Sequence, residues 1–284
     1  MEQKLRLRAG QIRLIALDLD GTLLDTEKVL RPENEAALRR AAESGIEIVP
    51  ATGRFYTAID EAVRKLPYIH YVITVNGAKI LAPGEDRVLF RAEIDWRRAV
   101  EVMRVLDRLP VIYDCFMDDW GWMTRSLYDQ AADYAPNQHC LEMLRTKRSP
   151  VPELKAHLAA VGHGVQKIQM FFRDPELRMK TLADLKMQFP DLAVTSSIPR
   201  NLELNNLEAQ KGTALRRLAA YIGIAPEQTM AFGDDWNDLS MLRAAGIAVA
   251  MGNAAPELQA EADFVTLSCD ENGVAKALEQ LLPI

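Results

Sequence analysis

Residues 12–24, with the sequence IRLIALDLDGTLL, join a short apolar run to two aspartates and a Gly-Thr step. A run such as Ile12–Leu17 is typical of a strand buried on both faces, as in the centre of a parallel sheet. Asp18 and Asp20 follow directly where this strand ends. Ligands of open parallel sheets bind outside the carboxyl ends of the strands, so this junction predicts a functional site.

Four further strand-like runs also end in polar residues and glycines. They are residues 46–50, 71–75, 229–232 and 247–251, followed by Thr52-Gly53-Arg54, Asn76-Gly77, Gly233-Asp234-Asp235-Trp236-Asn237-Asp238 and Gly252-Asn253. Turn formation alone explains one such junction. It explains the set poorly, because a pattern such as Asp-x-Asp-Gly-Thr arises by chance in roughly two in a thousand chains of this length.

The strands alternate with helix patterns at 32–45 and 210–222, which is typical of a parallel sheet with helices on both sides. From about residue 87 the pattern becomes helix–strand–strand, twice over. The helices are expected at 95–109 and 175–189, and the strands at 111–117, 121–125, 165–172, 192–198 and 201–205. This repeat predicts an antiparallel sheet with helices on one face.

The predicted fold class is therefore α/β, with two parts. Residues 1–86 and 204–284 are expected to form a Rossmann-like parallel-sheet core, split in the sequence. Residues 87–203 are expected to form a smaller α+β domain inserted into it.

Composition narrows the classes of function. The 284 residues include 34 Lys and Arg against 40 Asp and Glu, and the net charge of −6 argues against nucleic acid or an anionic membrane as partner. The three widely spaced cysteines form no pattern of a disulfide framework or a thiolate metal site, so a reducing, cytoplasmic location is expected. No segment reaches the ~18 apolar residues of a membrane span. The sequence leaves the oligomeric state open.

Several aspartates of the strand junctions are expected to converge on one crevice: Asp18, Asp20, Asp234, Asp235 and Asp238. Like charges at close range cannot all stay ionised without a cation among them. Oxygen ligands favour a hard ion, and Mg²⁺ is usual where a substrate brings phosphate oxygens. The four histidines, His70, His139, His157 and His163, show no metal-ligand spacing, which weighs against zinc.

Two further side chains are compatible with a bound phosphoryl group. Lys211 lies in the first turn of its predicted helix, where the helix dipole disfavours a cation by about 0.5 kcal/mol unless an anion is held nearby. A solvated surface lysine is the alternative. The Thr52 hydroxyl either donates to a phosphate oxygen or caps a helix.

Four motifs together resemble those of the haloacid dehalogenase-like (HAD) superfamily. In order, they are Asp18-Leu19-Asp20-Gly21-Thr22-Leu23-Leu24, Thr52-Gly53-Arg54, Lys211-Gly212 and Gly233-Asp234-x-x-Asn237-Asp238. The segments Asn76-Gly77-Ala78 and Ala250-Met251-Gly252-Asn253-Ala254 are similar to its Cof-type branch, which carries a type IIB cap. The resemblance covers about residues 12–282, and the inserted domain lies where that cap belongs.

The resemblance implies a Mg²⁺-dependent phosphatase that hydrolyses small phosphorylated metabolites, such as sugar phosphates or phosphorylated cofactors, through a phosphoaspartyl intermediate. Asp18 would be the nucleophile, and Asp20 the general acid and then the base. The phosphoryl oxygens would be held by Thr52, Gly53 and Lys211, with Asn237 beside them. The metal would be bound by Asp18, the backbone carbonyl of Asp20 and Asp234, with Asp238 acting behind them or through water.

Two other functions remain open at this stage. Phosphomannomutases resemble the same architecture, and a phosphomutase would return the phosphoryl group to a sugar instead of to water. The other is a phosphate-binding regulatory module without turnover, although Asp18, Asp20, Lys211 and Asp234 are all present. A membrane pump with aspartyl chemistry is excluded by the lack of membrane spans.

The resemblance also implies that the cap selects the substrate. Six residues of the inserted domain are possible contributors or cap-core residues: Asp118, Asp119, Trp120, Trp122, Met170 and Phe172. The bulky Trp236 departs from the fourth motif and is expected to pack against the cap or to narrow the entrance. Asp235 is an extra charge that the motif does not require.

Overall fold

The computed structural model describes residues 2–196 and 200–282. They divide into two compact units. The first unit contains Met1–Arg54, Ile59–Arg91 and Gln210–Ile284, and the second contains Phe55–Ala58 and Ala92–Ala209. Both boundaries lie a few residues later than predicted, because β5 (Arg87–Arg91) pairs with a strand of the first unit and β11 (Asn201–Asn206) extends the sheet of the second.

The first unit is built on a parallel sheet of five strands. Their order is β14 (Phe264–Val265), β13 (Ile247–Ala250), β12 (Thr229–Gly233), β1 (Leu14–Leu17) and β2 (Glu47–Pro50), and β1 lies between β12 and β2. Every residue of β1 and β12 is buried, as the apolar runs predict. The α/β fold class with a parallel-sheet core is confirmed.

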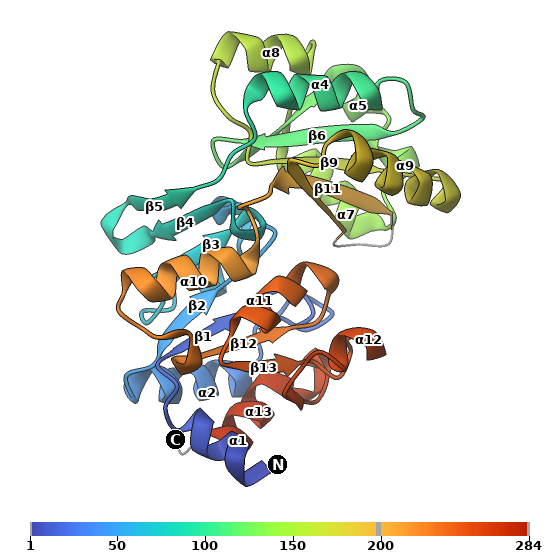
Figure 1. Ribbon diagram of the computed structural model, residues 1–284. Coiled ribbons are helices and arrows are strands. Elements are labelled where there is room, and N and C mark those ends of the chain that lie inside the picture. The colour runs from blue at the N-terminus through green and yellow to red at the C-terminus, as the bar shows by residue number, and fades with distance from the viewer. Residues whose placement is uncertain (1, 197–199, 283–284) are drawn as a thin grey trace. The chain divides into compact units, whose positions relative to one another are not determined.

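Helices cover both faces of this sheet. The helices α10 (Lys211–Tyr221) and α11 (Leu239–Ala244) contact each other and share a hydrophobic core with β1, β2, β12 and β13. The helices α2 (Pro32–Glu43) and α13 (Gly273–Leu281) pack together on the other side (Figure 1). Gly45, with φ of +84°, follows the end of α2 as expected of a helix-ending glycine. The remaining helices of this unit are α1 (Glu2–Ala9), α3 (Glu61–Arg64) and α12 (Pro256–Gln259).

The assignment of residues 71–75 to the parallel sheet is only partly right, because a single parallel bridge joins this strand to that sheet. The strand β3 (Val72–Thr74) forms a separate antiparallel sheet with β4 (Lys79–Ala82) and β5, neither of which was predicted. A bridge between Ala51 and Ile73 connects it to the end of β2. The chain reverses after β3 through Val75, Asn76 and Gly77, all with positive φ. That tight reversal makes β4 the neighbour of β3.

The second unit contains a sheet of six strands. Their order is β10 (Leu192–Thr195), β11, β9 (Lys167–Phe171), β6 (Ile112–Met117), β7 (Trp120–Thr124) and β8 (Arg148–Val151). All neighbours are antiparallel except β7 and β8. The predicted strand at 192–198 ends at Thr195, and residues 197–199 lie outside the described part of the chain.

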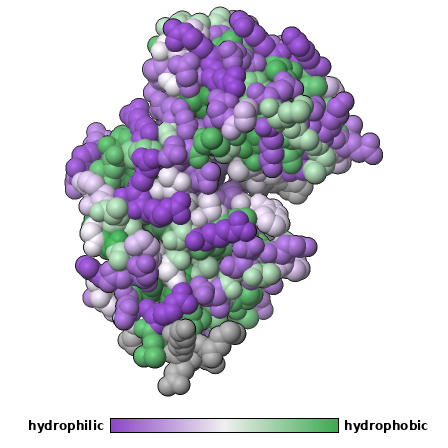
Figure 2. Space-filling view, in the orientation of Figure 1, coloured by the Kyte–Doolittle hydropathy of each residue, from purple (hydrophilic) through white to green (hydrophobic). Residues whose placement is uncertain are grey.

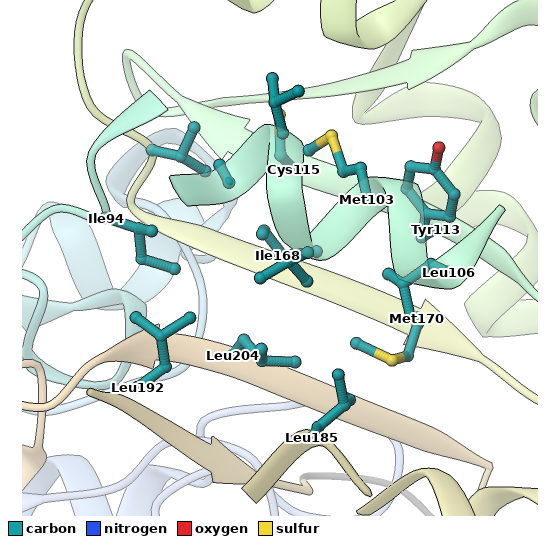
Figure 3. Close-up of a cluster of buried hydrophobic side chains, with 14 of the residues drawn as sticks. Ile94, Met103, Leu106, Tyr113, Cys115, Ile168, Met170, Leu185, Leu192 and Leu204 are labelled. Carbon is teal, nitrogen blue, oxygen red and sulfur yellow. The ribbon is translucent and has the colours of Figure 1, made fainter. Parts of the chain in front are cut away.

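One face of this second sheet is apolar and packs against α4 (Trp96–Leu106), α8 (Leu154–Val161) and α9 (Pro175–Gln188). Figure 3 shows Met103 and Leu106 of α4 together with Ile168 and Met170 of β9 in this core. The helix α4 begins at the predicted place, where the Asp95 carboxylate accepts a hydrogen bond from the backbone of Arg97.

The expectation that helices cover only one face of this sheet is wrong. On the other face, Ile112, Met123 and Phe171 pack against α6 (Ala131–Tyr134) and α7 (Gln138–Thr146), with α5 (Arg125–Asp129) beside them. These short helices lie in a polar segment without clear periodicity, where sequence patterns are weakest. On the viewed face of both units, hydrophilic residues predominate and hydrophobic ones are scattered among them (Figure 2).

The contact between α10 and α11 depends on Gly212. A Cβ atom there would lie 2.0 Å from the backbone oxygen of Ser240. We expect Gly212→Ala to lower the free energy of unfolding by about 1–3 kcal/mol, because the backbone of α11 must move. Urea unfolding followed by circular dichroism measures this change.

The matched control is Gly84→Ala, at an exposed glycine with nothing within 4 Å of the added atom. An unfolding free energy of Gly212→Ala equal to that of this control would contradict the close packing.

Candidate active site

A buried lysine bridges two aspartates at the carboxyl end of the parallel sheet. Asp18 is the first residue after β1, and Lys211 is the first residue of α10. The Lys211 Nζ atom lies 2.5 Å from Asp18 Oδ1 and 2.6 Å from Asp238 Oδ1. Lys211 and Asp238 are completely buried and Asp18 is nearly so. The alternative of a solvated surface lysine is therefore wrong.

Asp238 also organises the turn that follows β12. Its Oδ2 atom accepts hydrogen bonds from the backbone nitrogens of Asp234 and Asp235, at 3.1 and 3.2 Å. Asp235 in turn accepts from the backbone of Trp236, whose ring is half exposed. The extra aspartate of this motif thus fixes the start of a short 3-10 turn (Trp236–Asp238).

Asp234 completes a group of three carboxylates. Asp18, Asp234 and Asp238 each offer an oxygen, and these oxygens all lie within 4.8 Å of one another. Asp234 is held by the Thr22 hydroxyl, which donates to Oδ1 at 2.7 Å, and by the Asn253 amide at 3.4 Å from Oδ2. Among residues 2–196 and 200–282, no other group of His, Cys, Asp or Glu is arranged closely enough to hold a metal ion.

The charges of this group are unbalanced, since three carboxylates share one lysine. Burial raises the pKa of Asp18 well above its ordinary value, and Asp238 and Asp234 raise it further, against the effect of Lys211. Burial, with Asp238, raises the pKa of Asp234 to about 7. Burial alone would lower the pKa of Lys211, but Asp18 and Asp238 raise it. A hard cation among these oxygens would remove the repulsion, so the donor set fits Mg²⁺.

Asp20 lies apart from that group and is paired with two cations. The Arg54 Nε and Nη2 atoms lie 2.8 and 2.5 Å from its two oxygens, and the Lys28 Nζ atom lies 3.0 Å from Oδ1. Burial would raise its pKa, but Arg54 and then Lys28 lower it to about 2. The side chain of Asp20 is therefore ionised in this arrangement.

The other predicted ligands surround Asn76. Thr52 is buried, and its hydroxyl accepts a hydrogen bond from the backbone of Arg54 at 3.1 Å. A Cβ atom at Gly53 would lie 2.9 Å from Asn76 Oδ1, and the Asn237 amide donates to that same oxygen at 3.4 Å. Thr52, Gly53 and Asn237 are thus grouped around one asparagine.

The sequence reasoning assigned no role to four side chains that contact these residues: Thr22, Lys28, Arg54 and Asn253. Thr22, Arg54 and Asn253 stand inside motifs already quoted, so their position was a usable signal. Lys28 follows the first motif by several residues and has positive φ (+64°), which no sequence pattern indicates.

The residues of the second unit that were possible substrate contacts lie in different parts of that unit. Met170 and Phe172 belong to the hydrophobic core, and Trp122 packs against it with its ring 4.5 Å from that of His157. The ring of Trp120 lies 5.8 Å from that of Phe55, tilted by 50°. Asp118 and Asp119, both with positive φ, form the turn between β6 and β7.

Comparison with known proteins places this chain among hydrolases. A family described as haloacid dehalogenase-like hydrolase matches residues 15–278. A Bacillus subtilis protein named phosphatase YwpJ is 34% identical and covers 95% of this chain and 100% of its own. Another B. subtilis protein, named 5-amino-6-(5-phospho-D-ribitylamino)uracil phosphatase YcsE, is 30% identical over 94% of each chain.

A solved structure supports the fold. The structure of a haloacid dehalogenase-like hydrolase from B. subtilis matches with a TM-score of 0.80 and 34% identity, covering 95% of this chain and 100% of that one. None of the described helices is long and apolar enough to cross a membrane.

The raised pKa of Asp234 predicts that stability falls as pH rises. Between the ordinary value of 3.8 and about 7, the folded chain holds a proton that the unfolded chain has lost. The free energy of unfolding therefore decreases as pH rises through this range. In the presence of EDTA, we expect the melting temperature to fall between about pH 4 and pH 7 and Asp234→Asn to reduce that fall.

Thermal unfolding followed by circular dichroism at several pH values checks this expectation. The control is Asp86→Asn, at an exposed turn residue whose φ of +47° asparagine tolerates. If the melting temperature of Asp234→Asn falls with pH as steeply as that of Asp86→Asn, the pKa of Asp234 is not raised in the folded chain.

Proposed function

The chain belongs to the haloacid dehalogenase-like hydrolase family and is a phosphatase, and we propose that it hydrolyses small phosphorylated metabolites through a Mg²⁺-dependent phosphoaspartyl intermediate. The observation that carries this proposal is the buried Lys211 between Asp18 and Asp238, with Asp234 close by. A phosphoryl group is negatively charged, so a carboxylate repels it. Lys211 places a fixed positive charge beside the carboxylates, which offsets this repulsion.

Asp18 is the proposed nucleophile. Its carboxylate oxygen attacks phosphorus, the bond from phosphorus to the alcohol oxygen breaks, and an aspartyl phosphate forms. Water then attacks phosphorus, the bond to Asp18 breaks, and inorganic phosphate leaves. Dividing the displacement in this way replaces one difficult step by two easier ones. Lys211 places positive charge beside the oxygens on which negative charge develops.

Asp18, Asp234 and the backbone carbonyl of Asp20 are the proposed ligands of Mg²⁺. When bound, the ion offsets the carboxylate charge and polarises the phosphoryl oxygens. Asp238 is best assigned to positioning, since one of its oxygens binds Lys211 and the other accepts two backbone hydrogen bonds. Thr52, Gly53 and Asn237 are proposed to hold the phosphoryl oxygens together with Lys211.

Asp20 is proposed to move the protons. As a general acid it donates a proton to the departing alcohol oxygen, and as a base it then takes a proton from the attacking water. Paired with Arg54 and Lys28 it is ionised, which is the state required of the base. To act as the acid it must first gain a proton, so its contacts with these two cations must weaken when substrate binds.

We propose substrates of low molecular weight, as for the relatives. The protein YcsE is named for a ribityl-bearing uracil phosphate, and two relatives are named HMP-PP phosphatases. The second unit is proposed to act as the cap that selects among such compounds.

The Asp18 assignment predicts loss of turnover without loss of folding. With p-nitrophenyl phosphate as substrate, we expect hydrolysis in Mg²⁺, none in EDTA, and none for Asp18→Asn, because an amide is a poor nucleophile. Released p-nitrophenol is measured by absorbance. The control Asp86→Asn keeps full activity.

Activity that survives in Asp18→Asn would show that another group is the nucleophile. Transfer of phosphate between sugar hydroxyls, with dependence on a sugar bisphosphate, would show a phosphomutase instead of a hydrolase.

Asp20→Asn is expected to lower kcat by roughly 10²–10⁴-fold, because both proton transfers lose their catalyst. With p-nitrophenyl phosphate, whose leaving group departs readily as an anion, the first step needs little protonation. We therefore expect one rapid equivalent of p-nitrophenol in stopped flow, followed by slow turnover. An alkyl phosphate should show no such burst. A variant with near-normal kcat on both esters would remove Asp20 from the mechanism.

A further inference from the structure

Lys28 contacts the Asp20 carboxylate from a turn that follows the first motif. Its Nζ atom lies 3.0 Å from Asp20 Oδ1, the same oxygen that accepts a hydrogen bond from Arg54 Nη2 at 2.5 Å. The side chains of Lys28 and Asp20 are 35% and 34% exposed. An ion pair as exposed as this one contributes little to the stability of a fold. Stability therefore does not account for a lysine at this position.

The backbone of Lys28 adopts a conformation that lysine disfavours. Its φ of +64° lies in the left-handed region, which glycine and asparagine enter more readily than residues with long side chains. A residue in such a conformation persists only where its surroundings fix it, and residues of this kind are frequent at functional sites. The presence of lysine here favours a role for its side chain.

Hydrogen bonds on both sides of Lys28 fix the turn. Asp25 is buried, and its Oδ1 atom accepts from the backbone nitrogens of Glu27 and Val29 at 3.0 and 2.9 Å. The backbone nitrogen of Lys28 donates to the carbonyl oxygen of Asp25 at 2.9 Å. Glu27 and Val29 are exposed, whereas Lys28 is half-buried beside Asp20.

The same turn is attached to the rest of the first unit. The backbone nitrogen and the hydroxyl of Thr26 both donate to Oδ1 of Asp270, which precedes α13, at 3.0 Å each. Leu24, just before the turn, forms β-bridges with Asp20 and with Leu30. The amine of the lysine is therefore presented to Asp20 by a turn that is held in place from several directions.

We propose that Lys28 is a positioning residue for the hydrolytic step, in which it and Arg54 together hold the Asp20 carboxylate in the orientation that takes a proton from water. In that step the water oxygen bonds to phosphorus, the bond from phosphorus to Asp18 breaks, and a water proton passes to Asp20. Arg54 contacts both oxygens of Asp20, and Lys28 contacts one of them from a different segment. The two contacts restrict rotation of the carboxylate more than either does alone.

Lys28 acts through Asp20 and needs no contact with the substrate. This inference rests on the proposed role of Asp20 in the phosphatase function and deepens it.

Lys28→Asn tests the inference, since it removes the amine and suits the positive φ. With p-nitrophenyl phosphate in Mg²⁺, we expect kcat to fall about tenfold, because a misaligned base slows hydrolysis of the aspartyl phosphate. KM should fall with it and kcat/KM should stay unchanged, because the first step needs little protonation with this ester. Stopped flow should show a rapid release of p-nitrophenol before the slow turnover. A defect of folding would instead lower this rapid release and kcat/KM together.

Lys65→Asn is the matched control, at an exposed lysine that pairs with Glu61, and it should keep the kcat of the parent protein. Lys28→Arg retains a positive charge of similar reach, so we expect it to restore most of kcat. Thermal unfolding followed by circular dichroism should show that Lys28→Asn melts no lower than the parent. If it melts lower, Lys28→Met, which keeps the aliphatic chain, is measured in the same way with the same expected result.

A double variant separates action through Asp20 from an independent effect. Because Lys28 acts through Asp20, we expect Lys28→Asn to cause no further loss of kcat when it is added to Asp20→Asn. Losses that multiply in the double variant would overturn the inference, as would a folded Lys28 variant with the kcat of the parent and no rapid release. Near-normal kcat of Asp20→Asn would instead contradict the role of Asp20, and no hydrolysis by the parent would contradict the phosphatase function itself.

Discussion

The repulsion among three closely spaced carboxylates, two of them buried, is the constraint on which the first unit depends. Asp18, Asp234 and Asp238 come from two neighbouring strands of the parallel sheet and its following turn, so the topology forces them together. Lys211 offsets part of this charge and the remainder calls for a proton or a cation. The same imbalance that costs stability makes these oxygens a suitable donor set for a hard cation.

Two glycines occupy positions where the neighbouring carboxylates leave no room for a side chain. A Cβ atom at Gly21 would lie 2.4 Å from Asp234 Oδ2, and one at Gly233 would lie 2.4 Å from Asp238 Cβ. Gly21 also has φ of +85°, which a larger residue adopts only with strain. The glycines of the first and fourth motifs are therefore required by the same close approach of carboxylates that defines the site.

Local patterns predicted most strands of the core, the helix starts and the grouping at one sheet edge of three of the five aspartates expected there. They could not predict contacts set by side-chain reach or weakly patterned segments. The pairing of Lys28 with Asp20 depends on a turn with positive φ, and the pairing of β3 with β4 depends on the reversal at Asn76. The helices α5, α6 and α7 are short and follow no clear hydrophobic period, so only their packing against the sheet reveals them.

The two units arrange their buried charges in opposite ways. Around Lys211 the carboxylates outnumber the cation, and the excess negative charge suits a metal ion and, with it, a charged phosphoryl group. On one face of the second sheet, Arg148 and Lys167 are matched one to one by Asp114 and Glu203, so these buried charges balance.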